Sequence, residues 1–209
     1  MIRVKVLGSR SVKDSEMTDT AESWDISSIL RGCLAGDQSA IESMVRHFET
    51  GVFRLALSIV DDPLEASEIA QETFLAALRS LRSYEEKASF KAWLYTIALN
   101  LSRSHLRKRM ALKRLRSVLA AALQLEIRRQ VSPEERTIQN ETDDAVWNAL
   151  QRLDEKHRTP MILRYYQECS VMEIAQIMNV NEGTIHSRLH HARERLRGEL
   201  KDWVSEDVT

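Results

Sequence analysis

Apolar residues recur every three or four positions along most of the chain, which is the spacing of one face of an α-helix. A short helix is predicted from about Ile26, and a longer one over 39–60. The stripe of the longer helix consists of Ile41, Val45, Phe48, Val52, Leu55 and Ile59. The next helix is expected to start at Pro63, because proline fits the first helical position and Asp62 can cap it.

Two more stripes complete a helical domain that ends near residue 110. The helix after Pro63 is predicted to bury Ile69, Phe74, Leu78 and Leu81. Polar residues interrupt the pattern over 83–89. A fourth helix is then predicted from about Phe90 to Met110, and its buried face is expected to contain Trp93, Ile97 and Leu101 at four-residue steps.

A second, smaller helical domain is predicted near the C-terminus. Its helices are expected around Val146 to Leu153, Met161 to Tyr166, Ser170 to Met178 and Glu182 to Leu200. The fold class is therefore all-α, with two small helical domains joined by a linker. The expected boundaries are a flexible N-terminal extension at 1–25, a first domain at 26–110, a linker at 111–142 and a second domain at 143–203.

The composition agrees with a helical, cytoplasmic protein. Only 6 glycines and 3 prolines occur among 209 residues, which leaves few turn residues for a β-rich fold. The longest apolar run, 118–123, is far shorter than a membrane span, so no membrane insertion is expected. The start of the chain lacks the apolar segment of a secretory signal. Cys33 and Cys169 lie too far apart in sequence to suggest a disulfide framework, and no cofactor is predicted.

Charge is distributed unevenly, although the formal net charge is only −1. The segment 101–129 holds 9 basic residues and one acidic residue, whereas 61–72 holds 5 acidic residues and no base. Basic character returns over 188–201. Because electrostatic interactions are screened beyond roughly 10 Å, local charge says more about partners than the total does. Binding of a polyanion at two places is one interpretation, and solvated helix faces are the other.

Residues 170–193 have the pattern of a helix-turn-helix. Ser170 and Glu173 match a capping box, and Asn181 can cap the following helix. Ile174, Ile185 and neighbouring apolar residues can hold the two helices at a steep angle. The second helix is expected to present donors and basic groups to the edges of bases in a major groove, with a structural helical hairpin as the alternative. These residues are Thr184, His186, Ser187, Arg188, His190, His191 and Arg193.

Three segments together carry a resemblance to a known family. They are DDPLEASEIAQETF at 61–74, SFKAWLYTIALN at 89–100, and EIA at 173–175 with GTIHSRL at 183–189. In order and spacing they resemble the signatures of bacterial RNA polymerase sigma factors, sigma-70 family, extracytoplasmic-function (ECF) group. The resemblance covers about 26–110 and 143–200.

The resemblance implies a promoter-specificity subunit that catalyses no reaction. Its first domain, similar to sigma region 2, is expected to dock on core RNA polymerase and to open the promoter at the minus-10 element. Its second domain, similar to sigma region 4, is expected to read the minus-35 element as duplex DNA. The implied partners are the clamp of the largest polymerase subunit, the flap of the second, promoter DNA and an anti-sigma protein.

The resemblance also assigns roles to residues. An acidic surface is expected to bind the basic polymerase clamp, and it consists of Asp62, Glu65, Glu68, Gln71 and Glu72. Asn100 is expected to capture an extruded base, with a pocket formed by 83–89. The expected minus-10 contacts are Phe90, Tyr95, Asn100, Arg103, Arg107 and Lys108, in which the rings stack on bases and the cations hold phosphates, together with Arg109.

The second domain departs from the family pattern at two positions. Members of the family often have arginine where this chain has His186 and His191, so weaker or altered minus-35 contacts are expected, with Arg188 carrying more of the charge. His186 and His190 stand four residues apart, but no third ligand accompanies them, so no metal site is predicted. The alternatives are a stand-alone helix-turn-helix regulator and a nucleic-acid hydrolase. The second lacks any recognisable catalytic constellation, and no catalytic residue is predicted.

Overall fold

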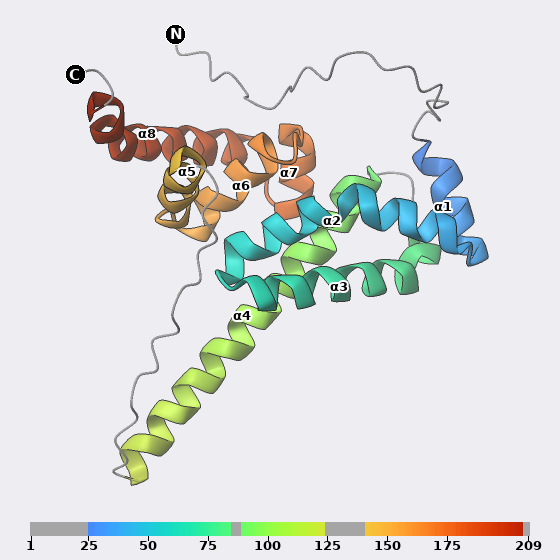
Figure 1. Ribbon diagram of the computed structural model, residues 1–209, viewed down its shortest axis with the longest axis horizontal. Helices are drawn as coiled ribbons and strands as arrows, with labels where there is room; N and C mark the ends of the chain where they lie inside the picture. The colour runs from blue at the N-terminus through green and yellow to red at the C-terminus, as the bar shows by residue number, and fades with distance from the viewer. Residues whose placement is uncertain (1–24, 85–88, 124–140, 207–209) are drawn as a thin grey trace.

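The computed structural model describes residues 25–84, 89–123 and 141–206, and within these ranges the regular structure is entirely helical (Figure 1). The predicted all-α class, with two small helical domains, is therefore confirmed. In chain order the elements are α1 (Ile26–Ala35), α2 (Gln38–Val60), α3 (Pro63–Ser80), the 3-10 helix η1 (Leu81–Ser83), α4 (Phe90–Leu123), α5 (Glu141–Gln151), α6 (Glu155–Tyr165), α7 (Val171–Met178) and α8 (Glu182–Glu206). The predicted N-terminal extension lies almost wholly outside the described residues, as does most of the second half of the linker.

Short-range capping signals set the ends of the first three helices. Asp37 and Asp62 accept hydrogen bonds from backbone amides of α2 and α3, and Pro63 takes the first position of α3. Gly36 ends α1 in the left-handed conformation, with φ of 80°, where glycine carries no steric penalty. The predicted boundary at Asp62 and Pro63 is confirmed.

The first core lies between α2, α3 and α4, and α1 packs on α2. Its largest fully buried side chains include Met44, Leu55, Ile69, Leu94 and Leu99. Burying side chains of this size removes apolar area from water, worth roughly 1.5–3 kcal/mol for each. This packing holds α3 and α4 at a fixed angle to each other.

The buried face of α4 is broader than predicted and rotated from the predicted one. Trp93, Ile97 and Leu101 are half-buried and pack against the core from its edge. The buried residues of α4 are Phe90, Ala92, Leu94, Tyr95, Ala98, Leu99 and Ser102. The prediction identified only part of the buried face because it assumed one covered surface, whereas α7 contacts α4 in addition to α2 and α3.

Helix α4 also continues beyond the predicted end at Met110. It runs to Leu123 and leaves the bundle as a single protruding helix, drawn in light green in Figure 1. The stretch 111–123 contains neither glycine nor proline and is rich in alanine, leucine, lysine and arginine, which are strong helix formers. Part of the predicted linker is therefore helical.

The second set of helices follows the predicted order, but several boundaries are shifted. Helix α5 begins at Glu141 rather than near Val146, and α8 extends to Glu206 rather than Leu200. Helix α6 begins at Glu155 rather than Met161, and Pro160 lies inside it. Proline usually disrupts a helix interior, but here Pro160 is in the second turn and is buried. The buried apolar residues of this part are Ala149, Leu150, Leu153, Met161, Ile162, Leu163, Cys169, Ile174, Ala175, Ile177, Met178, Ile185, Leu189, Ala192 and Leu196.

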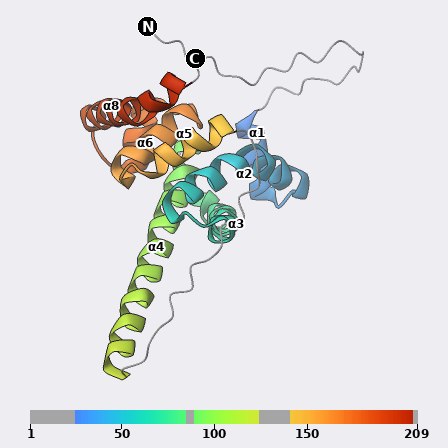
Figure 2. The same cartoon turned by 60° about the vertical axis from the view of Figure 1, so that its left-hand side comes forward.

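The two parts of the chain pack directly against each other. Helix α7 contacts α4, and α6 contacts α2, so the second set of helices covers one side of the first (Figure 2). The sequence predicted two domains but not this contact between them. Among the described residues, none of the helices combines the length and the apolar character needed to cross a membrane.

Candidate nucleic-acid and polymerase interfaces

Helices α7 and α8 form the predicted helix-turn-helix. The Ser170 amide donates to Glu173 Oε2 at 2.8 Å, and the Glu173 amide donates to Ser170 Oγ at 3.1 Å, which is the reciprocal pattern of a capping box. Asn179 ends α7 in the left-handed conformation with φ of 53°. Asn181 Oδ1 then accepts the Thr184 amide at 2.8 Å and caps α8. The turn is therefore fixed by backbone hydrogen bonds at the end of α7 and by the Asn181 side chain at the start of α8.

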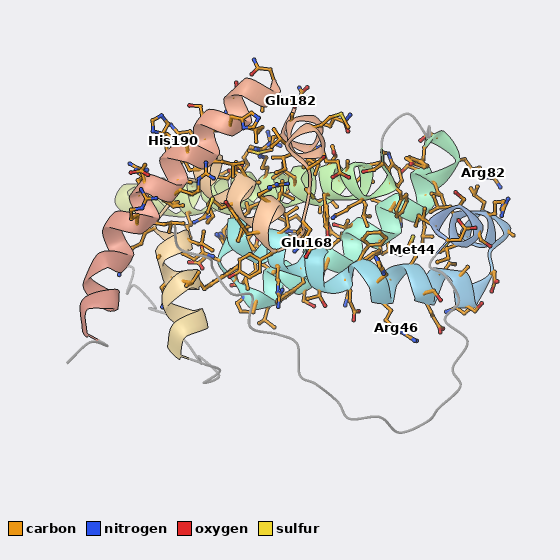
Figure 3. The ribbon with its side chains drawn as sticks, turned by 90° about the horizontal axis from the view of Figure 1, so that it is seen from above. Met44, Arg46, Arg82, Glu168, Glu182 and His190 are labelled. Atoms are coloured by element: carbon orange, nitrogen blue, oxygen red, sulfur yellow. The ribbon has the colours of Figure 1, made fainter. Side chains whose placement is uncertain are left out.

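The face of α8 that was predicted to read DNA lies on the outside of the molecule. In Figure 3, Glu182 and His190 lie on the side of α8 that points away from α2. Thr184 and Arg188 are half-buried. The exposed residues of the predicted set are His186, Ser187, His190, His191 and Arg193. The helix is anchored by Ile185 and Leu189 on its opposite face, so these side chains are held in a fixed orientation.

A polar cluster joins the start of α6 to the middle of α8. Asp154 binds His157 and lies 3.8 Å from Arg195 Nη1, and the His157 and His191 rings are 6.3 Å apart. Desolvation opposes ionisation of Asp154, but the hydrogen bond and charge of His157 together with Lys156 lower its pKa. The His191 ring therefore lies beside the His157 ring and is not isolated in solvent.

Replacing Glu173 with alanine is expected to lower the free energy of unfolding by about 1 kcal/mol, because the capping box then loses one of its two hydrogen bonds. Desolvation raises the pKa of Glu173, but hydrogen bonds from Ser89 and Ser170 outweigh it and lower the pKa overall. A carboxylate with a lowered pKa contributes stability above its ordinary pKa of 4.5 and loses it as the pH falls through the folded value.

Thermal denaturation at two pH values measures this contribution. The deficit of Glu173→Ala is expected to be full near about pH 7 and to shrink below about pH 4. Glu194→Ala is the matched control, since Glu194 is exposed and pairs with Arg197 within α8. A deficit that does not change with pH would show that the charge of Glu173 contributes nothing.

The residues predicted to bind the polymerase clamp lie at the start of α3 and along it, and some of them already contact other groups of the protein. Glu65 Oε2 pairs with Arg109 Nη1 at 2.5 Å, and Glu72 Oε2 lies 3.0 Å from His105 Nε2. Asp62 is occupied as the cap of α3. Glu68, Gln71 and Glu72 are exposed. The predicted acidic surface is thus partly neutralised by α4.

A groove of about 360 Å³ lies beside the exposed acids, between α2 and α3. Apolar atoms form most of its surface, and its polar side chains are Glu49, Thr50, Ser67 and Gln71. Leu64 and Leu75 on α3 are also exposed, with 80% and 52% of their surface accessible. Large exposed apolar residues beside a groove are typical of protein interaction sites. The groove is lined by Val45, Glu49, Thr50, Phe53, Ser67, Ala70, Gln71 and Phe74.

The predicted minus-10 residues of α4 also divide into two groups. Asn100, Arg107 and Lys108 are exposed. Phe90 and Tyr95 are buried, with 4% and 2% of their surface accessible, so neither ring can stack on a base in this conformation. Phe90 packs among the rings of Phe48, Tyr84 and Trp93.

Arg103 and Arg109 are engaged within the chain. Arg103 Nε donates to Glu155 Oε1 at 2.7 Å, and Arg109 Nη2 donates to the Val60 carbonyl at 2.7 Å in addition to its pair with Glu65. Arg109 therefore ties α4 to the end of α2 and the start of α3. Sequence reasoning assigned both arginines to DNA, because the sequence shows a charge but not its partner.

Comparison with protein families matches two segments of the chain. Residues 44–111 match sigma-70 region 2, and residues 143–196 match sigma-70 region 4. The ECF RNA polymerase sigma factor SigW of Bacillus subtilis is 32% identical over 172 residues, which cover 80% of this chain and 92% of SigW. This chain is an ECF sigma factor. The family resemblance found in the sequence is therefore confirmed.

Two further similarities agree with this assignment. The RNA polymerase sigma-H factor of Pseudomonas aeruginosa is 30% identical over 82% of this sigma factor and 91% of its own length. Among solved structures, the sigma factor RpoE of Bartonella quintana, in complex with the anti-sigma factor NepR, superposes with a TM-score of 0.59. The two are 26% identical over 77% of this chain and 96% of that one.

Membership of the family identifies the protein as a transcription initiation factor that gives RNA polymerase its promoter specificity. The comparisons support this function and not the alternative of a stand-alone regulator. The described residues contain no group of three or more histidine, cysteine, aspartate or glutamate side chains that could hold a metal ion.

Proposed function

We propose that this sigma factor docks on core polymerase through α3, opens the minus-10 element with the exposed part of α4, and reads the minus-35 duplex with α8. The observation that carries the proposal is the exposure of key residues at all three sites: Glu68 on α3, Asn100 on α4 and His186 on α8 are all exposed. Each lies on a helix whose opposite face is anchored in a core.

Docking on the polymerase is supported by charge and shape together. Glu68 and Gln71 lie beside the apolar groove between α2 and α3. A basic clamp helix could pair with the acid while its apolar residues enter the groove, and such a combination gives both fast association and affinity. Glu65 contributes less, because its charge is already paired with Arg109, whereas Glu72 is exposed and contacts His105.

Opening of the minus-10 element is assigned to the exposed stretch of α4. The Asn100 amide offers both donors and an acceptor to the edge of an unpaired base. Arg107 and Lys108 follow on the same helix and would hold the phosphates of the strand. The predicted pocket over 83–89 falls partly outside the described residues.

Reading of the minus-35 element is assigned to α8. Ser187 and Thr184 can bond to base edges, and Arg188 and Arg193 can contact bases or phosphates. His186 and His191, at positions where relatives often have arginine, are weaker phosphate ligands than arginine when they are neutral. The minus-35 element is thus bound with less electrostatic affinity than in relatives with arginine at these positions.

The remaining assignments concern partners and place of action. The sigma factor acts in the cytoplasm and catalyses no reaction itself. An anti-sigma protein is an expected partner, which the complex of the similar sigma factor RpoE with NepR supports. The linker, of which 124–140 lie outside the described residues, would run through the polymerase near its active centre and RNA exit path.

Run-off transcription with purified core polymerase tests the proposal. Fragments recovered by chromatin mapping of the expressed protein serve as templates. We expect transcripts with defined start sites only when both core enzyme and this sigma factor are present. A protein that binds the same fragments but gives no transcript with core enzyme would instead be a stand-alone regulator.

Replacing His186 with arginine is expected to tighten binding to the minus-35 duplex and to steepen its salt dependence by about 0.9 in log–log slope, since one more phosphate is neutralised. Fluorescence anisotropy across a salt series measures both quantities. Gln38→Arg adds the same charge on α2 and serves as the control. Equal slopes for the two variants would remove His186 from the DNA interface.

A further inference from the structure

Histidines are concentrated on the outer face of α8. Three of the 6 histidines in the chain lie on this helix, at 186, 190 and 191, and all three are exposed. At 3.6 residues per turn, the positions of His190 and His191 flank that of Ser187, opposite the buried Ile185 and Leu189. Figure 3 shows His190 on the side of α8 that points away from α2. The face proposed to read the minus-35 duplex therefore carries groups whose charge depends on pH.

The permanent positive charge on this face is small. Arg195 Nη1 lies 3.8 Å from Asp154 Oδ1, and Arg197 pairs with an acid on the same helix, so both arginines are partly neutralised. Among the residues that the structure describes, Arg188 and Arg193 have no such acidic partner. Protonation of the three histidines would add three charges to the two of Arg188 and Arg193. Most of the positive charge on this face would then come from bound protons.

His191 belongs to a cluster of ionisable groups. Its ring lies 6.3 Å from the ring of His157 on α6 and 5.6 Å from the ring of His190. His157 binds Asp154, which also lies 3.4 Å from Lys156 Nζ. Because several cations already share the carboxylate of Asp154, it offers little further negative charge to a proton on His191.

The elements packed against α8, which are α5, α6 and α7, bring few acids to this face. Within 146–151 of α5 there is no ionisable side chain, and Glu173, the one acid of α7, is bound by two serines outside α8. Glu155 of α6 pairs with an arginine of α4. On α8 itself, Glu182 stands one turn before His186, and Glu194 pairs within the helix. The arginines of α6 donate to backbone carbonyls of the second domain, and they are Arg158 and Arg164.

The phosphates of DNA would supply the negative charge that this face lacks. A proton on His191 or His190 brings a positive charge close to the other cations of the cluster, which opposes its uptake in the free protein. A phosphate placed on the same face favours that uptake and is itself bound more tightly by the protonated ring. Binding of duplex and binding of protons therefore strengthen each other by the same factor.

We propose that the minus-35 face of α8 is pH-sensitive, such that protonation of His186, His190 and His191 strengthens its binding to duplex DNA and promoter recognition increases as the pH falls from about 8 to about 6. This inference rests on the proposed role of α8. Because only the protonated ring attracts a phosphate by charge, the additional affinity is present at low pH and is lost as the pH rises. Arginine at 186 and 191 would abolish most of this dependence, since its charge does not change in this range.

Binding of DNA by holoenzyme, formed from core polymerase and the full chain, tests the proposal. The probe is a fluorescein-labelled duplex that carries the minus-35 element of a promoter recovered by chromatin mapping and ends before the minus-10 element. Anisotropy is measured across a salt series at about pH 6 and about pH 8. The wild type is expected to bind at least about fivefold more tightly at the lower pH, and its log–log salt slope is expected to steepen by about 0.9 for each phosphate newly neutralised.

A triple variant, His186→Gln with His190→Gln and His191→Gln, removes the titratable groups. It is expected to bind like the wild type at the higher pH and to gain little at the lower one. His47→Gln is the matched control, since His47 is an exposed histidine on α2, and it should keep the wild-type pH dependence. If the triple variant fails to fold, His186→Arg with His191→Arg takes its place, and it is expected to bind at the higher pH at least as tightly as the wild type does at the lower one.

Arg188→Ala separates failure of this inference from failure of the proposed function, because arginine is charged at both pH values. A pH dependence that the triple variant loses and His47→Gln keeps supports the inference. Equal pH dependence of the wild type and the triple variant overturns it, and if Arg188→Ala then weakens binding at both pH values, α8 still reads the minus-35 duplex. If neither the triple variant nor Arg188→Ala changes binding, α8 does not contact the duplex, and the proposed role of α8 fails together with the inference.

Discussion

Replacing Glu68 with lysine is expected to weaken association with core polymerase at least about tenfold and to make the remaining affinity less sensitive to salt. Reversing one charge in a close pair costs more than about 1.4 kcal/mol in well-defined interfaces, which corresponds to that factor. Glu68 is suited to this test because its side chain is exposed. Glu65 is not, because removing it would leave Arg109 without its carboxylate partner.

Binding of labelled sigma factor to core enzyme, measured across a salt series in the absence of DNA, checks this expectation. Glu194→Lys makes the same change of charge on α8 and is expected to retain affinity. Thermal denaturation should give equal stability for wild type and Glu68→Lys, since exposed charge substitutions change it little. Unchanged affinity in a folded Glu68→Lys protein would place the docking surface elsewhere.

Features that depend on neighbouring residues in the sequence were predicted well. Asp62 with Pro63, and Ser170 with Glu173, mark helix starts because a short polar side chain satisfies backbone amides two or three residues away. Asn181 does the same for α8. These signals need no knowledge of the rest of the fold, so the sequence alone was enough to identify the helix-turn-helix.

Features that depend on contacts distant in sequence could not be predicted. The buried face of α4 includes Tyr95 because the second domain covers it, and nothing in a helical period indicates a second covering surface. The sequence shows the charges of Arg103 and Arg109 but not that each forms an ion pair within the chain. Their partners are Glu155 and Glu65. Gly51 was the one available signal, since an isolated glycine within a helix usually has a packing reason, and a Cβ there would overlap the Tyr95 hydroxyl.

These distant contacts change how the charge of the chain should be understood. The basic segment and the acidic segment are not two independent surfaces, because His105 and Arg109 of the first bind Glu72 and Glu65 of the second. The charged surface that is left to bind partners is therefore smaller than the sequence suggests. On α3 it includes Glu68 with the adjoining groove, and on α4 it includes the exposed stretch that contains Asn100 and Arg107.

Replacing Asn100 with alanine is expected to slow formation of the open promoter complex roughly 10- to 100-fold. Loss of paired hydrogen bonds to one base costs about 1–3 kcal/mol in nucleic-acid recognition, and here the base must also be held out of its stack. Asn100 is exposed, and alanine has a higher helix propensity than asparagine, so the stability of the fold is expected to stay unchanged. Affinity for core polymerase is expected to stay unchanged.

Permanganate reactivity of unpaired thymines on a promoter used by the wild-type protein measures opening directly. Arg107→Ala is the informative comparison, because Arg107 is a phosphate contact on the same helix. It should weaken binding to all strands alike and lower the salt slope by about 0.7. Asn100→Ala should instead abolish discrimination at one base position and leave the salt slope as it is. If both variants lower the salt slope and neither changes base preference, α4 holds the strand only by charge, and base capture belongs to another part of the chain.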